Sequence, residues 1–372
     1  MGHKIGKIGV VMVGAFPPPV HGMAAVNLAV SQALTQSGVK VTIVNLAGRS
    51  LKRTIAVRLT RIPAAFAGIN RFLRLKGARG ETFYMSVSGG LGQVYEVLFL
   101  LLARVKGMRI FVHHHSFAYI DRFSWLTNCL CRIAGSEAIH ATQSPGMAER
   151  LRRQYGTKRT IAISNAVFLL QGMPQHVSPR QKIRTLGFLS NLSTEKGVFE
   201  FLELMNLVQR RGLPLRGVLA GPFEDERTER LVRDCMVGLE NVTYVGPKYG
   251  CEKIAFFDSI DAFAFPTRYA NETEGIVTHE AMSRGIPVIA YGRGCIPEIV
   301  GEDCGAVIQP EQSFATCALE KLEHWIRDVS SFERASRIAA ERFANTHSDS
   351  EIRWRALLRD LMGSDGHSGM TR

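Results

Sequence analysis

FAFPTRYANETEGIVTHEAMSRGIPVIA, residues 263–290, is the stretch from which the architecture of this 372-residue chain is predicted. An apolar strand over residues 261–265 leads into a polar loop, and a helix opens near Gly275. Gly285 and Pro287 end that helix, and a second apolar strand follows over residues 286–291. A strand, loop, helix and strand in this order predict half of a doubly wound α/β unit.

The same stretch contains two carboxylates, Glu272 and Glu280, with Gly275 between them. Backbone amides at a helix start favour phosphate oxygens, and glycine lets the backbone come close to a ligand. Two carboxylates repel a phosphate, so we expect them to accept hydrogen bonds from hydroxyl groups on either side of it. The alternative is that neither binds a ligand: Glu272 would then be a solvated loop residue and Glu280 a surface residue of the helix.

Residues 272–289 resemble a known family signature. They read E-T-E-G-I-V-T-H-E-A-M-S-R-G-I-P-V-I, which is similar to the pattern E-G-F-G-L-V-L-L-E-A-M-A-x-G-x-P-V-I of the retaining, GT-B-fold glycosyltransferases of family 4 (glycosyl transferases group 1). G-R-G-C-I-P-E-I-V, residues 292–300, resembles that family's G-G-x-P-E-I-V segment. The resemblance implies an α/β fold of two Rossmann-like, doubly wound domains facing a cleft, and a nucleoside diphosphate sugar as donor.

The chain begins with the pattern of a Rossmann-like βαβ unit. A buried strand over residues 8–14 is followed by a proline-rich loop, a helix over residues 23–37 and a strand over residues 39–46. The first loop is not G-x-G-x-x-G. It resembles the family loop that faces the interdomain cleft, where Gly14 and Gly22 would allow a close backbone approach to the donor.

Three consecutive histidines end a predicted strand in RIFVHHHS, residues 109–116. Alternation puts His113 and His115 on one face of the strand and His114 on the other. Consecutive strand residues do not easily ligate one metal ion, so a metal site is disfavoured. The family resemblance gives His115 the role of facing the donor sugar, with His113 as the alternative on the same face.

The second half begins with a strand over residues 182–190 and the loop N-L-S-T-E-K-G, residues 191–197. This loop resembles the family's G-R-L-x-x-E-K-G. Lys196 matches the lysine that contacts the donor diphosphate, whereas Asn191 replaces the family arginine. We therefore hypothesise that Arg268 supplies the missing guanidinium.

The resemblance completes a set of roles for the donor site. Lys196, Arg268 and the amides near Gly275, Ile276 and Val277 would stabilise the departing diphosphate. Glu280 would bind ribose hydroxyls and Glu272 sugar hydroxyls. No residue stands out as a covalent nucleophile, so a same-face displacement with retention is implied.

Charge and linker composition divide the chain. Residues 1–180 hold 23 Lys+Arg and 5 Asp+Glu, a net +18, which leaves −5 of the total of +13 for the rest. Residues 170–182 have the composition of a linker. We predict an acceptor-side domain over residues 1–172, a nucleotide-sugar-binding domain over 173–345, and a helix with a tail over 346–372 that crosses back to the first domain.

Nine basic residues and no acid lie within residues 49–79, among many large apolar ones. This mixture predicts an interfacial segment on an anionic membrane surface, although a helix with a solvated basic face fits equally. No signal peptide or membrane span is predicted. The seven scattered cysteines indicate reduced thiols. The expected location is therefore cytoplasmic, peripheral at the inner face of the plasma membrane.

The predicted function is hexose transfer to a saccharide acceptor, lipid-linked, in cell-surface polysaccharide assembly. No cofactor is expected, and because the chain lacks a D-x-D motif, no metal is expected either. One alternative is a GT-B-fold sugar-nucleotide epimerase, which would act on the donor alone. A nucleic-acid-binding protein is suggested only by the pI of 9.6. The sequence has no recognisable reading module, so nucleic acid is not a predicted partner.

Overall fold

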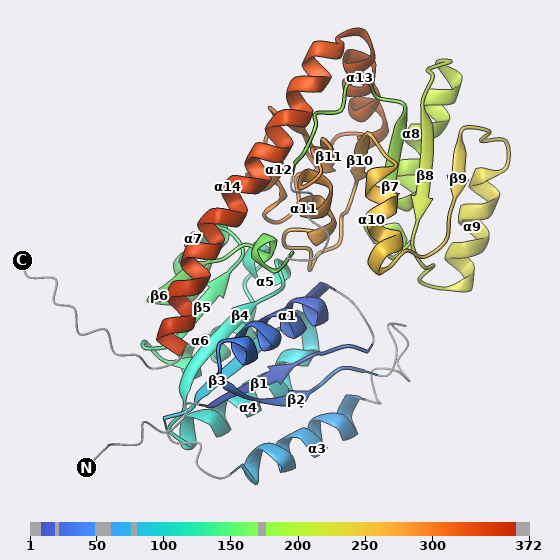
Figure 1. The fold of residues 1–372 in the computed structure, drawn as a ribbon. Coiled ribbons are helices and arrows are strands. Elements are labelled where there is room, and N and C mark those ends of the chain that lie inside the picture. Colours follow the sequence, from blue (N-terminus) through green and yellow to red (C-terminus); the bar gives the residue numbers. More distant parts are fainter. Residues whose placement is uncertain (1–8, 19–21, 49–60, 76–79, 170–175, 362–372) are drawn as a thin grey trace, which may run out of the picture. The chain divides into compact units, whose positions relative to one another are not determined.

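The computed structural model describes residues 9–18, 22–48, 61–75, 80–169 and 176–361. The chain forms two compact units (Figure 1): unit 1 contains residues 1–168 and 349–372, and unit 2 contains residues 169–348. Each unit is described by itself. The predicted bounds at 172 and 345, and the acceptor and donor roles, stay predictions.

Unit 1 is built on a six-stranded parallel sheet of order β2-β1-β3-β4-β5-β6. The strands are β1 (Gly9–Gly14), β2 (Lys40–Asn45), β3 (Thr82–Val87), β4 (Arg109–His114), β5 (Ile139–Thr142) and β6 (Arg159–Ala162). Strands β1 and β3 are buried along their whole length, as the apolar runs predict. The strand order reverses between β1 and β3, which is where open α/β sheets bind ligands.

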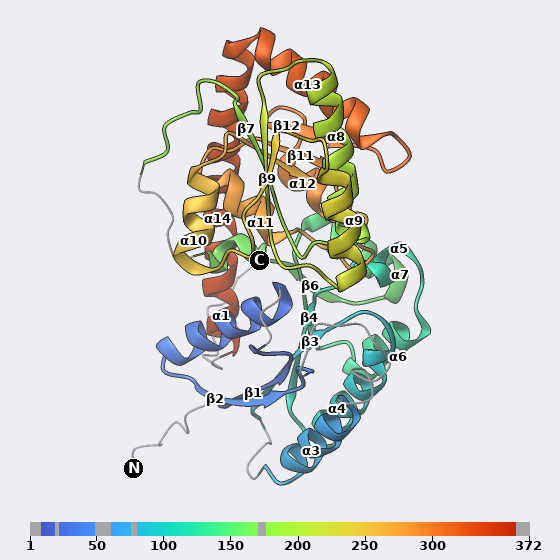
Figure 2. The same ribbon diagram turned by 90° about the vertical axis from the view of Figure 1, so that its right-hand side faces the viewer.

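Helices cover both faces of this sheet. They are α1 (Gly22–Gln36), α3 (Arg61–Leu73), α4 (Gln93–Val105), α5 (Ala118–Asp121), α6 (Trp125–Ala134) and α7 (Pro145–Tyr155), with the 3-10 turns η1 (Gly90–Gly92) and η2 (Asn165–Phe168). Helix α7 begins with Pro145 after Ser144, whose side chain accepts the Met147 amide, and ends at Gly156 with φ 69°. Helices α3, α4 and α6 lie together on the face opposite α1 (Figure 2).

Unit 2 has a second six-stranded parallel sheet, of order β12-β11-β10-β7-β8-β9. Its strands are β7 (Thr185–Leu189), β8 (Arg216–Ala220), β9 (Val242–Tyr244), β10 (Ala262–Phe265), β11 (Val288–Tyr291) and β12 (Gly305–Ile308). Strand β10 pairs with β7, and the strand order reverses between these two. The predicted strand–loop–helix–strand run is therefore present as β10, α11 and β11.

The helices of unit 2 are α8 (Val198–Arg210), α9 (Glu226–Met236), α10 (Gly250–Asp258), α11 (Ile276–Met282), α12 (Ile296–Val300) and α13 (Phe314–Arg327), with the 3-10 turn η3 (Thr194–Lys196). Helices α8 and α13 pack against the sheet through the buried side chains of Phe201, Leu204, Met205 and Trp325, among others. The α/β class is confirmed, because both units are doubly wound parallel sheets.

Helix α14 (Val329–Leu361) is one continuous element of 33 residues. The sequence predicts three C-terminal helices ending at residues 330, 344 and 362, and the break at 344 is wrong. The weak helix formers after Ala344 favour a break, but packing on both sides holds the helix. In unit 2 the Ser336 hydroxyl donates to the Gly285 carbonyl oxygen at 2.5 Å, and in unit 1 Trp354 packs on Phe168.

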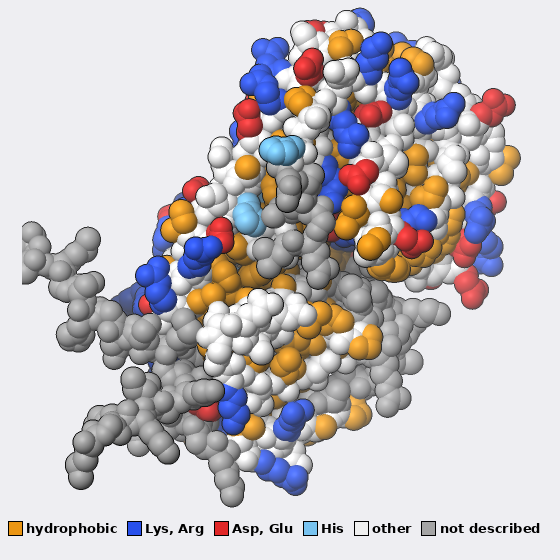
Figure 3. All heavy atoms as spheres, viewed as in Figure 1, with side chains coloured by type: hydrophobic (Ala, Val, Ile, Leu, Met, Phe, Trp, Pro, Cys, Tyr) orange, Lys and Arg blue, Asp and Glu red, His pale blue; other side chains and the backbone are white. Residues whose placement is uncertain are grey.

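Within the described ranges, no helix is both long enough and apolar enough to cross a bilayer. On the visible face of unit 2, acidic and basic side chains are interspersed (Figure 3). Of the predicted basic segment, residues 49–60 and 76–79 lie outside the described residues, and α3 forms the helix expected within it.

Candidate functional site

The predicted donor residues lie in two loops at one edge of the unit 2 sheet. One loop, residues 190–197, follows β7, and the other, residues 266–275, follows β10. These strands are neighbours and parallel, so their carboxyl ends lie side by side at the point where the strand order reverses. The strand order thus places the two loops together.

Gly197 fixes the contact between the loops. Its φ of 87° is left-handed, and a Cβ atom built there would lie 2.1 Å from the Pro266 carbonyl oxygen. Only glycine fits this conformation and this contact. The turn is closed on its other side by Ser193, whose hydroxyl accepts the Lys196 amide at 3.3 Å.

Lys196 and Glu272 form an ion pair between Nζ and Oε2 across the two loops. Their side chains are only 20% and 12% exposed, so the charges attract each other more strongly than on an open surface. The Lys196 ammonium also lies 4.6 Å from the centre of the Tyr269 ring. A cation and a carboxylate therefore share the predicted position of the diphosphate and the sugar.

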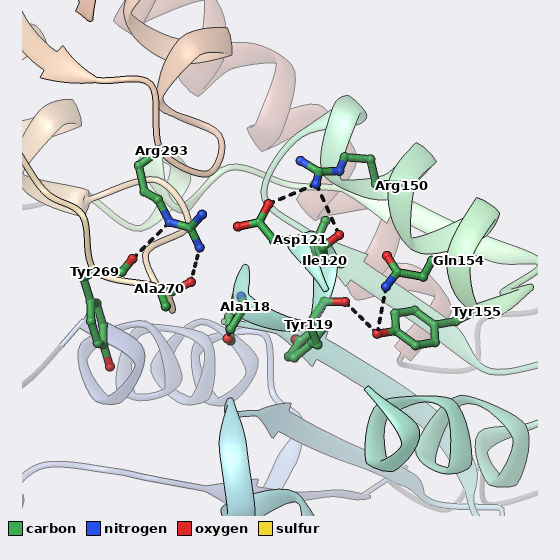
Figure 4. A network of polar contacts seen from close by, with 11 residues as sticks. Ala118, Tyr119, Ile120, Asp121, Arg150, Gln154, Tyr155, Tyr269, Ala270 and Arg293 are labelled. Atoms are coloured by element: carbon green, nitrogen blue, oxygen red, sulfur yellow. Dashed lines mark hydrogen bonds and ion pairs between the residues drawn. The ribbon is translucent and has the colours of Figure 1, made fainter. Parts of the chain in front are cut away.

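Arg293 and Gly294, which follow β11, contact the backbone of the β10 loop. Arg293 donates through Nε to the Tyr269 carbonyl oxygen at 3.1 Å and through Nη2 to that of Ala270 (Figure 4). A Cβ atom on Gly294 would lie 2.4 Å from the Thr273 carbonyl oxygen. Neither residue is a sequence candidate, although both belong to the G-R-G run that the family resemblance covers.

Glu280 lies on α11 and forms an ion pair with Lys253 of α10, at 2.5 Å between Oε2 and Nζ. Gly275 precedes the helix with a φ of 60°, and a Cβ atom there would lie 2.3 Å from the Phe265 ring. Ile276 and Val277 form the first turn, whose amides have no preceding helical carbonyl to bind. Their role toward a phosphate stays a prediction.

Arg268 and Asn191 take different positions at this edge. Arg268 donates through Nη2 to the Tyr291 hydroxyl at 2.6 Å, and its Nε lies 3.7 Å from Oε1 of Glu200. The bond to Tyr291 raises the pKa of Arg268, and burial raises the pKa of Glu200. Asn191 is exposed, in the loop that follows β7. The substitution of Arg268 for the family arginine stays a hypothesis.

A buried pair within the motif was missed by the sequence reasoning. Glu274 and His279 are 1% and 0% exposed, and His279 Nε2 lies 3.3 Å from Glu274 Oε1. The sequence signal that could have found them is their position, because both lie between the two glutamates of the motif and each is within two residues of one of them. The pair ties the β10 loop to α11, and so it positions Glu272 and Glu280 relative to each other.

In unit 1, His115 follows the carboxyl end of β4. Its ring centre lies 4.0 Å from that of His113, so the two share a face as alternation predicts. His113 is buried, and its Nδ1 lies 2.6 Å from the Tyr84 hydroxyl. Burial lowers the pKa of His113 to about 3. His115 is half-buried and is thus the more accessible of the two.

His114 points to the other face, where it lies in a buried polar network. Its Nδ1 is 3.0 Å from the Tyr119 hydroxyl and its Nε2 is 3.0 Å from Nδ1 of His140. Burial lowers the pKa of both histidines, that of His140 to about 4. These neutral rings fix the end of β4, as a satisfied core histidine does.

Helix α5, just after His115, is fastened to α7 by polar contacts (Figure 4). Arg150 donates to the Ile120 carbonyl oxygen at 3.3 Å and to Asp121 Oδ1 at 3.0 Å. The Tyr155 hydroxyl donates to the Tyr119 carbonyl oxygen at 2.6 Å. The segment that follows β4 therefore has a defined position within unit 1.

Gly14 ends β1 under close packing. A Cβ atom there would lie 2.0 Å from the Ser86 hydroxyl and 2.9 Å from Nδ2 of Asn27. Gly14 is therefore required by the packing of unit 1 itself. Gly22 opens α1, and a Cβ atom there would meet nothing within 4 Å. The predicted ligand approach at both glycines is untested.

Among the residues that the structure describes, no three His, Cys, Asp or Glu side chains are grouped so that they could hold a metal ion. Independence from metal stays a prediction. Gly14, Gly22 and His115 belong to unit 1 and the other predicted site residues to unit 2.

Comparison with known proteins agrees with this arrangement. The sequence model of the family "Glycosyl transferases group 1" matches residues 174–342, which lie within unit 2. The sulfoquinovosyl transferase SQD2 of Arabidopsis thaliana is 34% identical over 142 residues. That match covers 35% of this chain and spans only 25% of the relative.

Two solved structures are similar over nearly the whole chain. Sucrose-phosphate synthase from Thermosynechococcus elongatus has a TM-score of 0.70 at 16% identity, covering 95% of this chain and 99% of that one. Anabaena Alr3699/HepE, solved in complex with UDP and glucose, has a TM-score of 0.63 at 15% identity, covering 94% and 100%. These two likenesses concern the fold alone. Residues 174–342 are thus similar in sequence to the glycosyl transferases group 1 family.

Proposed function

We propose that the protein is a retaining, metal-independent glycosyltransferase that moves a hexose from a nucleoside diphosphate sugar to a saccharide acceptor. The observation that carries the proposal is the Lys196–Glu272 ion pair at the reversal of strand order in unit 2. It joins the two motif loops of the family domain and places a cation beside a carboxylate. A donor sugar diphosphate offers a partner to each of them.

Donor binding exchanges the partners of this pair. The diphosphate competes with Glu272 for the Lys196 ammonium, because its two phosphates each carry a negative charge whereas Glu272 carries only one. Glu272 is then released to accept hydrogen bonds from sugar hydroxyls. Glu280 accepts hydrogen bonds from the ribose hydroxyls, and Arg268 adds positive charge near the phosphates. The UDP complex of the Anabaena neighbour supports uracil as the first base to test.

The chemical step separates a diphosphate from an oxocarbenium-like sugar. The bond from the anomeric carbon to the phosphate oxygen breaks, and a bond to the acceptor oxygen forms on the same face. The acceptor's proton passes to the leaving phosphate oxygen. Lys196 and the first-turn amides of α11 stabilise the charge that develops on the leaving group, which is the main contribution such a site makes.

The acceptor in this proposal is a lipid-linked saccharide used in cell-surface polysaccharide assembly. The net +18 of residues 1–180 supports it, because anionic lipid attracts a basic surface. The enzyme would then work at the inner face of the plasma membrane, as a peripheral protein.

The test is to incubate the protein with UDP-, GDP- and ADP-hexoses, each with and without a polyprenyl-linked saccharide. We expect nucleoside diphosphate release from one donor only when the acceptor is present, and a product whose anomeric proton coupling in NMR matches that of the donor. Conversion of the donor alone would favour the epimerase instead, and an inverted product would exclude retention.

A further inference from the structure

Helix α4 exposes a continuous apolar stripe on the surface of unit 1. The stripe consists of five exposed side chains at spacings of three and four residues, which we call the α4 stripe: Leu91, Val94, Leu98, Leu101 and Val105. Their exposed fractions range from 41% for Leu98 to 85% for Val105. This periodicity places the four that belong to α4 on one side of the helix, and Leu91 lies in the 3-10 turn η1 just before it.

The other side of α4 already supplies the core. Phe99, Leu100 and Ala103 are fully buried, and Phe99 packs edge-on against Phe72 of α3. The α4 stripe is therefore not needed to bury the helix against its own unit. An exposed apolar stripe on a helix whose opposite side is already buried is expected at an apolar boundary.

Neighbouring elements extend the apolar surface. Phe66 and Leu73 of α3 are 68% and 51% exposed, and Phe123 and Trp125 at the start of α6 are 48% and 78% exposed. Together with the α4 stripe they make nine of the fifteen exposed large hydrophobic side chains of the described residues. Helices α3, α4 and α6 lie side by side (Figure 2), so a concentration of this kind on one layer marks an interaction surface.

Basic residues outnumber acidic residues in this layer. Exposed arginines flank the apolar side chains on or next to the same three helices: Arg71, Arg74, Arg104, Arg122 and Arg132. The one acidic residue within α3, α4 and α6 is Glu96, which is buried, and the exposed acidic residues next to these helices are Asp121, paired with Arg150, and Glu137. The layer therefore presents apolar side chains with a basic margin.

We propose that the layer of α3, α4 and α6 binds an anionic lipid surface. The α4 stripe and Trp125 enter the boundary between headgroups and acyl chains, and the arginines contact the lipid phosphates. Two copies of this chain meeting through the same surface would bring arginines against arginines, which disfavours self-association. The surface extends well beyond residues 49–79 and uses none of the residues of the donor site.

The proposed lipid-binding surface starts near one edge of the unit 1 sheet. Leu91 lies in η1, in the connection that follows β3, and Trp125 opens α6, which follows β4 after the short helix α5. The surface therefore begins at the carboxyl edge of the unit 1 sheet, which also bears His115. An acceptor anchored in the same lipid surface would lie beside this edge.

Co-sedimentation with vesicles tests the surface without donor or acceptor. The wild type is expected to sediment with phosphatidylglycerol-containing vesicles and not with pure phosphatidylcholine. The double substitution Leu98→Ser/Leu101→Ser should weaken binding at least about tenfold, because two exposed leucines lose their burial in lipid. Leu231→Ser in unit 2, where the leucine is 43% exposed, is the matched control and should bind like wild type.

Tryptophan fluorescence gives an independent readout. Of the three tryptophans, Trp125 is 78% exposed, whereas Trp325 and Trp354 are buried. We expect a blue shift on adding anionic vesicles, quenching by lipids with brominated acyl chains, and loss of both in Trp125→Phe. Unchanged sedimentation of the double variant would overturn the proposal. Equal binding of the wild type to neutral and anionic vesicles would also overturn it. So would a wild-type protein that binds no vesicles and forms a dimer that the double substitution dissociates.

Discussion

The Nζ atom of Lys196 is paired with Oε2 of Glu272, although 76 residues separate the two in sequence. The parallel pairing of β7 with β10 brings their loops together, and the contact of Gly197 with Pro266 fixes the distance between the loops. The pair is therefore a property of the sheet topology. It also means that a phosphate entering the site meets a lysine that already has a partner.

Replacement of Glu272 by glutamine separates affinity from turnover. In Glu272→Gln, Lys196 loses its carboxylate partner, so UDP should bind roughly three- to tenfold more tightly, as expected for loss of a part-buried competing ion pair. Hexose transfer should nevertheless fall at least about tenfold, because an amide accepts sugar hydroxyls less strongly than a carboxylate. Calorimetry and a transfer assay measure the two effects. Weaker UDP binding in the variant would contradict the partner exchange.

Glu280 is predicted to accept hydrogen bonds from the ribose hydroxyls of the nucleotide. The wild type should prefer UDP over 2′-deoxy-UDP by about tenfold or more, since a hydrogen bond to a charged group contributes roughly 1.5–3 kcal/mol. In Glu280→Gln this preference should shrink to within about threefold, whereas Glu252→Gln on the exposed side of α10 should keep it. Competition binding with the two nucleotides decides the matter, and an unchanged preference in Glu280→Gln would assign the ribose to other residues.

The two left-handed glycines Gly197 and Gly212 offer a matched comparison. Gly212 has a φ of 62°, and a Cβ atom there would meet open space. Gly212→Ala should therefore lower the free energy of unfolding by only about 1 kcal/mol, through backbone strain alone. Gly197→Ala adds a clash with the Pro266 carbonyl oxygen and should cost roughly 3 kcal/mol or more. Thermal melting with and without nucleotide measures both variants. Equal destabilisation by the two would show that the loop contact is not tight.

Acid should destabilise unit 1 through its buried histidines. The pKa values of His113 and His140 are lowered from 6.5 to about 3 and about 4. The native state therefore binds fewer protons than the unfolded chain below about pH 6.5. The free energy of unfolding then falls as the pH drops from 6.5 toward 4.

Glu96 acts in the opposite direction. Burial raises its pKa from 4.5 to about 7, so its contribution is fully present below 4.5 and is lost as the pH rises through 7. Glu96→Gln removes this compensation. Its free energy of unfolding, measured by urea titration, should fall more steeply than that of wild type as the pH drops from about 7 to about 5, by up to roughly 1.4 kcal/mol per pH unit. The exposed Glu137→Gln is the control, and parallel slopes in Glu96→Gln and wild type would refute the assignment.

Sequence patterns predicted the parts of the fold that depend on local signals. The apolar strands, Gly275 before α11 and Gly285 after it follow from chain flexibility and burial, and each lies where it was expected. The end of the helix near Ala344 was predicted wrongly, because the tertiary contacts that keep α14 continuous are not visible in local propensity.

The candidate site was predictable only in part, for the same reason. The family pattern points to Lys196, Glu272 and Glu280, but the lysine partner of each glutamate comes from another part of the chain. Arg293 and the Glu274–His279 pair support the site through contacts with backbone and buried groups. The motif marks where Glu274 and His279 lie, but no periodicity or spacing in a single sequence shows that they pair with each other.

Calorimetric titration of the wild-type protein with UDP, GDP and ADP tests the central claim most directly. One nucleotide should bind. Lys196→Ala should weaken its binding by about tenfold to a hundredfold, the effect of losing a charge-assisted hydrogen bond to phosphate, while the exposed Lys182→Ala should leave it unchanged. Binding of no nucleotide, or equal binding in Lys196→Ala and wild type, would contradict the assignment of these loops to a nucleoside diphosphate sugar.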